Sequence, residues 1–234
     1  MSAGEAGASE RTLTTPVAAA VLDYGAGNLV SVRAGLEAAG AAVRIARRPS
    51  DLVGAQLLVV PGVGASGPAM ARLRRSGLDR ALREALADGA WYLGICLGLQ
   101  LLFERSDEDG AEMLGLLGGD VRSIPGAPRL PHIGWNTVEI VHSHPILDGV
   151  ADGTAAYFVH SYAGLPSDPA CVVAETEHGG RFPSVVASGR FLGTQFHPER
   201  SGAPGLRILA ASVALAGGAD APAKAARPAL AGRA

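Results

Sequence analysis

The run from Trp91 to Phe103 constrains the fold of this chain more than any other stretch of its sequence. Residues 91–95 form a short and mostly apolar run, which is typical of a strand buried in a parallel sheet. The residues from Leu97 onward predict a helix, with residues 101–103 on its inward face. Cys96 stands between the two elements, so the sequence predicts a strand, a sharp turn at a cysteine, and a helix.

Gly94 and Gly98 flank Cys96 and give the pattern Gly-x-Cys-x-Gly. This is a thiol variant of the elbow that exposes a nucleophile between a strand and a helix. Side chains at the two glycines would collide with neighbouring elements in so sharp a turn. The elbow predicts a sulfur above a helix N-terminus, which favours the thiolate. A buried structural cysteine, acting as a small hydrophobe, is the alternative interpretation.

The first hundred residues alternate between predicted strands and helices. Such alternation predicts an α/β fold with three layers, in which helices cover both faces of a mostly parallel, flavodoxin-like sheet. Asn28 is placed to cap the first helix. The predicted strands are 16–22, 42–46, 57–60 and 91–95, and the predicted helices are 29–39, which ends at Gly40, and 78–86, which ends before Gly89.

Two glycine-rich turns follow predicted strands in this half. Residues 23–28 carry two glycines of a dinucleotide-binding loop, but Val30 replaces the third, so an ordinary strand–turn–helix corner is favoured. Residues 61–67 form a loop whose backbone N–H groups are free to point into a site, with a plain β-to-α loop as the alternative. Sites in doubly wound sheets form beyond the carboxyl ends of the strands, where this loop and Cys96 both fall.

The pattern changes after Phe103, where an acidic, glycine-containing loop spans residues 104–112. Short strands then recur between turn residues, and Ser188-Gly189 is typical of a hairpin. We expect a mixed or antiparallel continuation of the sheet, closed by a helix over 205–215. The predicted strands lie near 120–124, 133–141, 155–160, 171–176, 184–187 and 191–196, and the predicted inward positions of the last helix are Leu206, Leu209 and Val213.

Length and composition limit the class of protein. The 234 residues are enough for one large domain, and a net charge of −2 without a basic block gives no sign of nucleic-acid binding. Cys96 and Cys171 form no disulfide framework, which suits a reducing cytoplasm. Because the sequence lacks metal-binding spacings of Cys and His, we expect no metal and no cofactor.

The two ends of the chain differ in composition from the rest. Residues 1–15 are small, polar and acidic, without the apolar centre of a signal peptide. Residues 218–234 are mainly Ala, Pro and Gly with a few basic residues, and no apolar run is long enough to span a bilayer. We expect disorder over 1–15 and 218–234, a single domain over 16–217, and a cytoplasmic location.

A second motif, Gln195-Phe196-His197-Pro198-Glu199, follows the last predicted strand. Residues two apart in near-extended chain face the same side, so Glu199 is placed to hydrogen-bond one ring nitrogen of His197. The other nitrogen is then free for a thiol, and Cys96, His197 and Glu199 together predict a nucleophile, a base and an orienting acid. Solvated or structural roles are expected for His132, His142, His144 and His178, which lie near proline, glycine or predicted turns.

The combination of Gly94–Gly98 with Gln195–Glu199 resembles the class I, or triad, glutamine amidotransferases. Further motifs narrow the resemblance, over about Val17 to Leu215, to the glutaminase subunits of imidazole glycerol phosphate synthases. These motifs are Asp23-Tyr24-Gly25-Ala26-Gly27-Asn28-Leu29, Pro61-Gly62-Val63-Gly64, Pro131-His132-Ile133-Gly134-Trp135-Asn136 and Phe158-Val159-His160-Ser161-Tyr162.

The resemblance implies a role for each matching residue. Cys96 matches the nucleophile, His197 the general base and acid, and Glu199 its orienting partner. The backbone N–H of Leu97 matches the first donor of the oxyanion hole. The strand at Val63 and Gly64 matches the second donor, after a peptide flip when the partner and its ligand are bound. Positions around the glutamine are matched by Gln100, Glu108, Ser161 and Tyr162, and the face toward the partner by Trp135, Asn136, Tyr157 and Arg200.

The resemblance also implies a reaction and a partner. Glutamine is hydrolysed to glutamate and ammonia through a cysteinyl thioester, and the ammonia passes to a (β/α)8-barrel cyclase subunit in a heterodimer. The products there are imidazole glycerol phosphate, for histidine biosynthesis, and an aminoimidazole carboxamide ribotide. Arg200 departs from the expected lysine and differs from it in shape and donors, so the contact at the interface changes. His178 replaces a common aromatic residue, with no catalytic consequence expected.

Three other interpretations are open at this point. A related triad amidotransferase, such as the glutaminase partner of a pyridoxal phosphate synthase, would share the triad but not Gly134-Trp135-Asn136. A cysteine hydrolase or peptidase on a similar sheet would not release ammonia from free glutamine in a partner-dependent way. A binding or regulatory module would lack a member of the triad, and this sequence carries all three.

Overall fold

The structure is a computed structural model that describes residues 15–124 and 126–218. Residues 1–14, 125 and 219–234 lie outside the described residues, and the predicted disorder of the two ends therefore stays a prediction. Within the described ranges, every helix is too short or too polar to cross a membrane.

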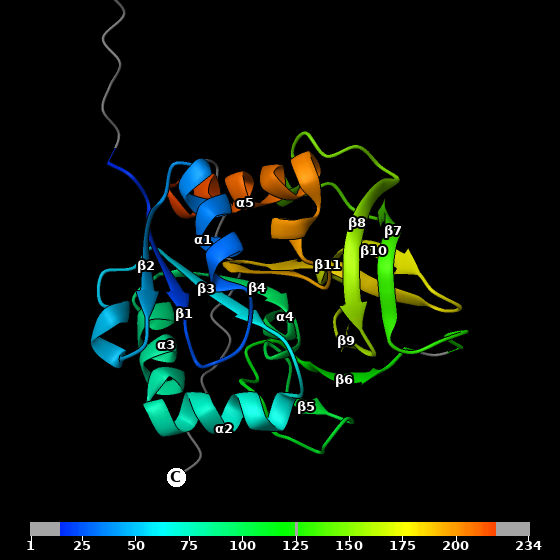
Figure 1. Ribbon diagram of the computed structural model, residues 1–234, viewed down its shortest axis with the longest axis horizontal. Helices are drawn as coiled ribbons and strands as arrows, with labels where there is room; N and C mark the ends of the chain where they lie inside the picture. The colour runs from blue at the N-terminus through cyan, green and yellow to red at the C-terminus, as the bar shows by residue number, and fades with distance from the viewer. Residues whose placement is uncertain (1–14, 125, 219–234) are drawn as a thin grey trace, which may run out of the picture.

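A nine-stranded sheet forms the centre of the molecule, in the order β2-β1-β3-β4-β12-β11-β10-β7-β8 (Figure 1). The strands from β2 to β12 are parallel, and those from β12 to β8 are antiparallel. The prediction of a mostly parallel sheet with a mixed or antiparallel C-terminal part is confirmed. The strands are β1 (Ala18–Leu22), β2 (Ala42–Ala46), β3 (Leu57–Gly62), β4 (Trp91–Cys96), β7 (His132–Ile140), β8 (Thr154–His160), β10 (Val172–Glu177), β11 (Arg181–Ser188) and β12 (Phe191–Thr194).

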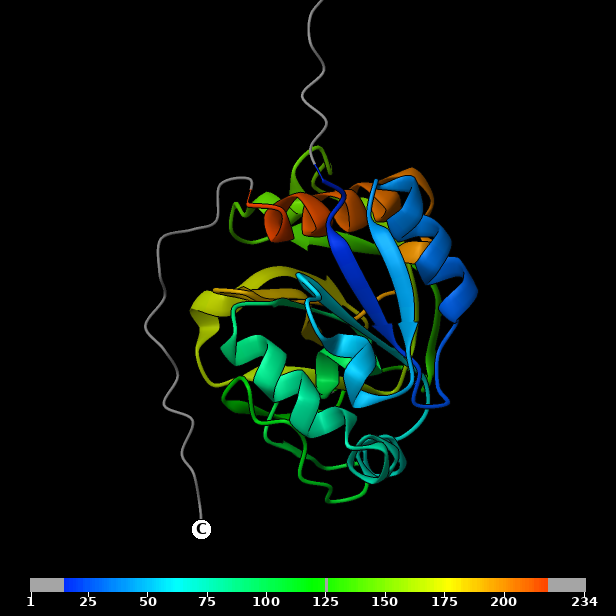
Figure 2. The same cartoon turned by 90° about the vertical axis from the view of Figure 1, so that its left-hand side faces the viewer.

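Helices cover both faces of the parallel half, with α1 and α5 on one face and α2, α3 and α4 on the other (Figure 2). Alternate residues of β3 point to opposite layers: Leu57 and Val59 pack toward α1 and α5, whereas Leu58 and Val60 pack toward α2 and α3. Because both faces of the strand are buried, its sequence is one continuous apolar run. The helices are α1 (Leu29–Ala38), α2 (Ser66–Ser76), α3 (Leu78–Ala87), α4 (Leu97–Gln100) and α5 (Gly202–Ala216).

A second, three-stranded sheet follows the order β5 (Arg105–Ser106), β6 (Gly119–Ser123) and β9 (Tyr162–Pro166). Strand β9 begins two residues after β8 ends and passes the ring of Phe103 so closely that a β-carbon on Gly164 would lie 2.0 Å from Cε2 of that ring. The contact holds β9, which the sequence analysis does not predict, against the segment that follows the elbow.

The helix predicted after Cys96 is wrong in length. Helix α4 is a single turn, because the carbonyl groups of residues 101–103 accept hydrogen bonds from the N–H groups of Leu114, Leu116 and Gly115 instead of continuing the helix. Residues 101–103 are fully buried all the same. A helix this short contributes local N–H donors to Cys96 but little of the dipole expected for it.

Two further expectations are corrected. Residues 61–67 do not form a loop throughout, since Ser66 already begins α2, a helix that the sequence analysis does not predict. Leu206 was expected to face inward, but its side chain is 45% exposed, whereas Leu209 and Val213 are buried. The buried stripe of α5 begins at Gly205 and recurs at three- and four-residue steps, which leaves position 206 off the stripe.

Candidate active site

The elbow at Cys96 is built from close backbone contacts. Cys96 has φ +54°, the one positive φ among the non-glycine residues that the structure describes. A β-carbon on Gly98 would lie 1.7 Å from the carbonyl oxygen of Val60, and one on Gly94 would lie 2.5 Å from the backbone of Gly98. Strained backbone of this kind persists where the surrounding structure over-determines it, and it is common at active sites.

His197 lies just beyond β12, the strand that pairs with β4 on the side away from β3. A one-turn 3-10 helix, Pro198–Arg200, brings Glu199 back toward the ring, and Nδ1 of His197 lies 2.8 Å from Oε1 of Glu199. Both side chains are buried, at 6% and 1% exposure. Because the carboxylate is an acceptor, Nδ1 carries the proton and Nε2 is left for another partner.

The charge state of His197 depends on its two neighbours. Burial by itself lowers the pKa of His197, but the interactions of the ring with the Cys96 sulfur and with the Glu199 carboxylate outweigh burial and raise the pKa well above 6.5. The pairing of β4 with β12 brings Cys96 and His197 to one rim of the sheet, where Nε2 of His197 is buried and makes no hydrogen bond within the described residues, so it is left to act on the Cys96 sulfur. This arrangement is suited to moving a proton from a thiol to a leaving group.

Cys96 is 5% exposed, and its sulfur lies between two further polar groups. The carbonyl oxygen of Val159 is 3.8 Å from it, and Nε2 of Gln195 is also 3.8 Å away. Gln195 has no predicted role, although it stands two residues before His197 in the second motif. Spacing within that motif is the signal that points to it, since residues two apart face the same side.

The loop expected to complete an oxyanion hole lies beside the elbow. Gly62 pairs with Cys96 in the β3–β4 register, so Val63 and Gly64 follow at the same level as the sulfur. Gly64 has φ +90°, and Val63 is 49% exposed. The hydroxyl of Tyr24 donates to the carbonyl of Pro61 at 2.7 Å and fixes the start of this loop, a role that sequence reasoning misses.

Three of the four residues expected around a substrate lie together. The side-chain amide of Gln100 donates to the carbonyl of Tyr162 at 2.7 Å and to Oε1 of Gln195 at 3.2 Å. Ser161 precedes Tyr162, and its carbonyl accepts from the N–H of Ile124 at 3.2 Å. These contacts place Gln100, Ser161 and Tyr162 on the side of the sulfur that Gln195 occupies.

Glu108 lies at the N-terminus of α2, with its carboxyl group near the backbone of Ser66. The neighbouring Asp109 accepts from the N–H of Gly67 at 2.6 Å and so pins the acidic loop to the helix. Burial, followed by the charge of Asp109, raises the pKa of Glu108, and a hydrogen bond from the backbone of Ser66 opposes the rise. Helix α2 begins soon after the Val63–Gly64 loop, so Glu108 lies near the end of that loop.

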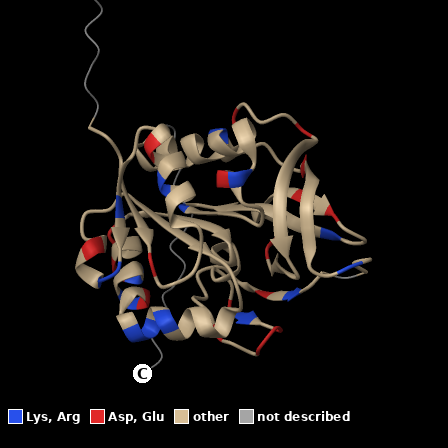
Figure 3. Ribbon diagram, viewed as in Figure 1, with Lys and Arg blue, Asp and Glu red and all other residues tan. Residues whose placement is uncertain are grey.

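The residues expected to face a partner lie on β7, β8 and the segment after His197. Trp135 is 60% exposed and packs edge-on against Tyr157, with ring centroids 6.1 Å apart. The guanidinium of Arg200 lies 4.1 Å above the Tyr157 ring. The side-chain amide of Asn136 instead donates to the carbonyl of Glu177 at 2.8 Å, toward β10. Few charged residues lie along β7 and β8 (Figure 3).

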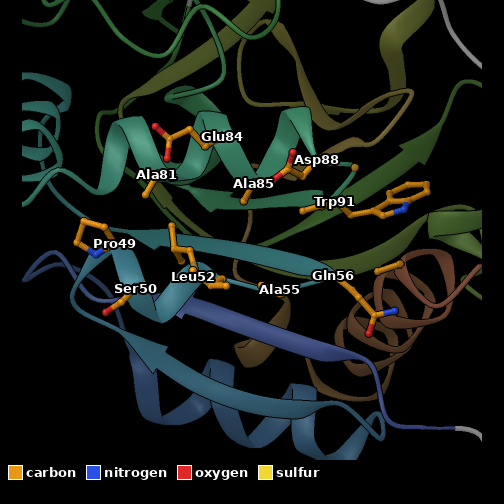
Figure 4. Close-up of a pocket in the computed structure, with 15 residues that line it drawn as sticks. Pro49, Ser50, Leu52, Ala55, Gln56, Ala81, Glu84, Ala85, Asp88 and Trp91 are labelled. Carbon is orange, nitrogen blue, oxygen red and sulfur yellow. The ribbon is translucent and has the colours of Figure 1, made fainter.

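A separate hollow of about 670 Å³ lies at the amino-terminal ends of β3 and β4, opposite the end that carries Cys96 (Figure 4). Gln56, which precedes β3, and Trp91, which opens β4, line it together with Glu84 and Asp88 of the α3 region. Because Cys96 closes the far end of β4, this hollow is remote from the triad. Among the described residues, no three His, Cys, Asp or Glu side chains gather as a metal site would require.

Comparisons with known proteins agree with this geometry. The family model of the class I glutamine amidotransferases matches residues 20–214. The chain is 48% identical over 191 residues to the imidazole glycerol phosphate synthase subunit HisH of Symbiobacterium thermophilum, a match that covers 81% of this chain and 90% of that protein. It is 49% identical over 198 residues to HisH of Halobacterium salinarum, covering 81% and 89%.

Solved structures show the same fold at lower identity. A crystal structure of a glutamine amidotransferase superposes with a TM-score of 0.68 at 22% identity, covering 84% of this chain and 98% of that one. The structure of PurLQS from Thermotoga maritima gives 0.68 at 20% identity, covering 85% and 98%. The curated relatives favour the synthase subunit over the other interpretations of the motifs. The chain therefore belongs to the class I glutamine amidotransferases and, within them, to the family of imidazole glycerol phosphate synthase subunits HisH.

Proposed function

We propose that this chain hydrolyses glutamine with Cys96 as nucleophile, His197 as base and acid, and Glu199 as the group that orients His197. The single observation that carries the proposal is the convergence of the three side chains at the carboxyl ends of β4 and β12, with Nδ1 of His197 held 2.8 Å from Glu199. The membership of the chain in a glutamine amidotransferase family supplies the substrate.

The chemistry follows from these positions. The Cys96 thiolate attacks the side-chain amide of glutamine, and the raised pKa of His197 keeps a proton on the ring for the departing ammonia. The N–H groups of Leu97 and of the Val63–Gly64 loop take up the charge that develops on the amide oxygen. One such donor is typically worth about 3–4 kcal/mol of barrier. Water then hydrolyses the thioester to glutamate, with His197 as base.

The ammonia is used by a partner, which we propose to be the cyclase subunit HisF, a (β/α)8 barrel, in a heterodimer. Ile133 and Trp135, 61% and 60% exposed, form an apolar face with Tyr157 and Arg200 that suits a protein partner. Cys96 and His197 are both buried, which supports activity that rises when the partner moves the covering segments. Two free cysteines suit the proposed cytoplasmic location.

A glutaminase assay of the chain alone, and of the chain mixed with the cyclase subunit and its nucleotide ligand, tests this function. We expect the chain alone to release glutamate and ammonia in a one-to-one ratio, and glutamate formation to rise at least tenfold in the complete mixture, where the cyclase subunit consumes the ammonia. The complex should also form imidazole glycerol phosphate from glutamine. Hydrolysis of peptide or ester substrates without release of ammonia from glutamine would contradict the proposal.

A further inference from the structure

A chain of hydrogen bonds crosses from β7 to β8 and on to β9. His132 and His160 are directly opposed in the β7–β8 register, and Nδ1 of His132 lies 3.2 Å from Nε2 of His160. At one end, the side-chain nitrogen of Asn136 lies 3.2 Å from Nε2 of His132. At the other end, Nδ1 of His160 lies 2.8 Å from the carbonyl oxygen of Tyr162.

The groups at the two ends of this hydrogen-bond chain determine which atom donates in each of its hydrogen bonds. A carbonyl can accept but cannot donate, so His160 donates from Nδ1 to Tyr162, and its neutral ring accepts at Nε2. His132 must then donate from Nδ1 to His160, which leaves its own Nε2 as an acceptor for Asn136. The amide of Asn136 is oriented independently, because its oxygen accepts from the N–H of Thr137 at 2.8 Å and its nitrogen donates to Glu177.

The surroundings keep both rings neutral. Burial lowers the pKa of His132 to about 4, and the charge of His178 acts in the same direction. Burial likewise lowers the pKa of His160 to about 3, against the hydrogen bond to Tyr162. His132 is stacked between His178 and Phe158, with ring centroids at 4.1 and 4.9 Å. The stack holds the ring in the plane that its two hydrogen bonds need.

The two ends of the hydrogen-bond chain lie in different functional regions. Asn136 follows Trp135, which lies on the face proposed for the partner, whereas the carbonyl of Tyr162 also accepts from Gln100, which in turn contacts Gln195 beside the Cys96 sulfur. We propose that His132 and His160 are positioning residues for glutamine hydrolysis. Their one-way hydrogen-bond chain runs from the partner-facing strand β7 to the carbonyl of Tyr162, and it sets the position of the Tyr162–Gln100 pair at the substrate. This inference rests on the proposed function.

Two ring-for-ring substitutions in the same stack test the proposal kinetically, in the complex with the cyclase subunit. His132→Phe keeps an aromatic ring but breaks both hydrogen bonds, so we expect the KM for glutamine to rise about tenfold while kcat changes less than threefold. His178→Phe keeps a ring stacked on His132 and breaks none of the hydrogen bonds that link Asn136, His132, His160 and Tyr162, so both constants should stay within twofold. His132→Asn, which returns a donor near the position of Nδ1, should recover part of the lost KM.

A spectroscopic measurement on the unaltered chain is independent of those variants. In a sample labelled with 15N-histidine, we expect His132 and His160 to be neutral at pH 7 and protonated on Nδ1. An Nε2–H tautomer or a charged ring at either position overturns the proposal, as does a KM in His132→Phe within twofold of the unaltered complex. An unaltered complex that releases no ammonia from glutamine would instead refute the proposed function. The tautomers of His132 and His160 would still show whether the hydrogen-bond chain exists.

Discussion

Gly98 lies so close to Val60 that a β-carbon at position 98 would overlap the carbonyl oxygen of residue 60, at 1.7 Å. Val60 belongs to β3 and Gly98 to the first turn after the elbow, so this contact sets how near α4 sits to the sheet. Because the obstructing atom is backbone in a central strand, it cannot swing aside as a side chain would. The position of the sulfur therefore depends on a residue without a side chain two positions away.

Gly98→Ala should destabilise the fold by about 3 kcal/mol, because the added methyl group forces β3 and α4 apart. Gly118→Ala is the matched control, since a β-carbon there would meet Ser167 at an ordinary 3.7 Å. Urea unfolding of both variants measures the difference. A Gly98→Ala protein as stable as the Gly118→Ala protein would show that the elbow is looser than the structure indicates.

Cys96→Ala should lower glutamine-dependent activity of the complex by at least about 1000-fold, because the nucleophile is lost. Synthase activity with an added ammonium salt should stay within twofold. The control is Cys171→Ala: burial and the charge of Asp168 raise the pKa of Cys171 to about 11, so its thiol stays protonated and takes no part. Equal loss of both activities in Cys96→Ala would mean that Cys96 has a structural role.

Glu199→Gln should lower kcat for glutamine hydrolysis on the order of 100-fold, because His197 loses the carboxylate that orients it and supports its charge. Glu175→Gln, which alters a partly exposed carboxylate 3.5 Å from Arg181, should leave kcat unchanged. Steady-state ammonia release measures both. A Glu199→Gln enzyme with normal kcat would remove Glu199 from the triad.

The same variant should change how stability depends on pH. The folded-state pKa of His197 is raised above 6.5, so its contribution to stability is complete below about pH 6.5 and is lost as pH rises through the folded-state pKa. Unfolding free energy of the unaltered chain should therefore fall between pH 7 and 9, and fall less steeply in Glu199→Gln. Urea unfolding at several pH values tests this, and identical slopes would contradict it.

Trp135→Ala should weaken binding of the cyclase subunit about 30-fold, which corresponds to about 2 kcal/mol for an exposed aromatic anchor. Its unfolding free energy should change by less than about 1 kcal/mol, because the side chain is 60% exposed. Val53→Ala, at a residue 76% exposed on the opposite edge of the sheet, should leave binding unchanged. Calorimetric titration of the two variants separates a partner-facing residue from a merely exposed one.

The sequence by itself determined the features that depend on neighbouring residues. Periodicity in the first hundred residues predicts β1 to β4 within one or two residues at each end. The glycines around Cys96 predict a strained turn, because the need for small residues there is local. The pairing of His197 with Glu199 is also predicted from their spacing, but the structure makes it through the 3-10 helix Pro198–Arg200 and not through the extended chain that the prediction assumes.

The tertiary structure alone decided what depends on contacts between distant segments. Helix α4 stops after one turn because residues 114–116 take the carbonyl groups that would continue it, and no local pattern reveals that competition. Gln195 reaches Cys96 across 99 positions, and His132 meets His160 through strand register 28 positions apart. Hydrogen bonds of this kind depend on where strands pair, and pairing is settled by burial of the whole sheet rather than by any one segment.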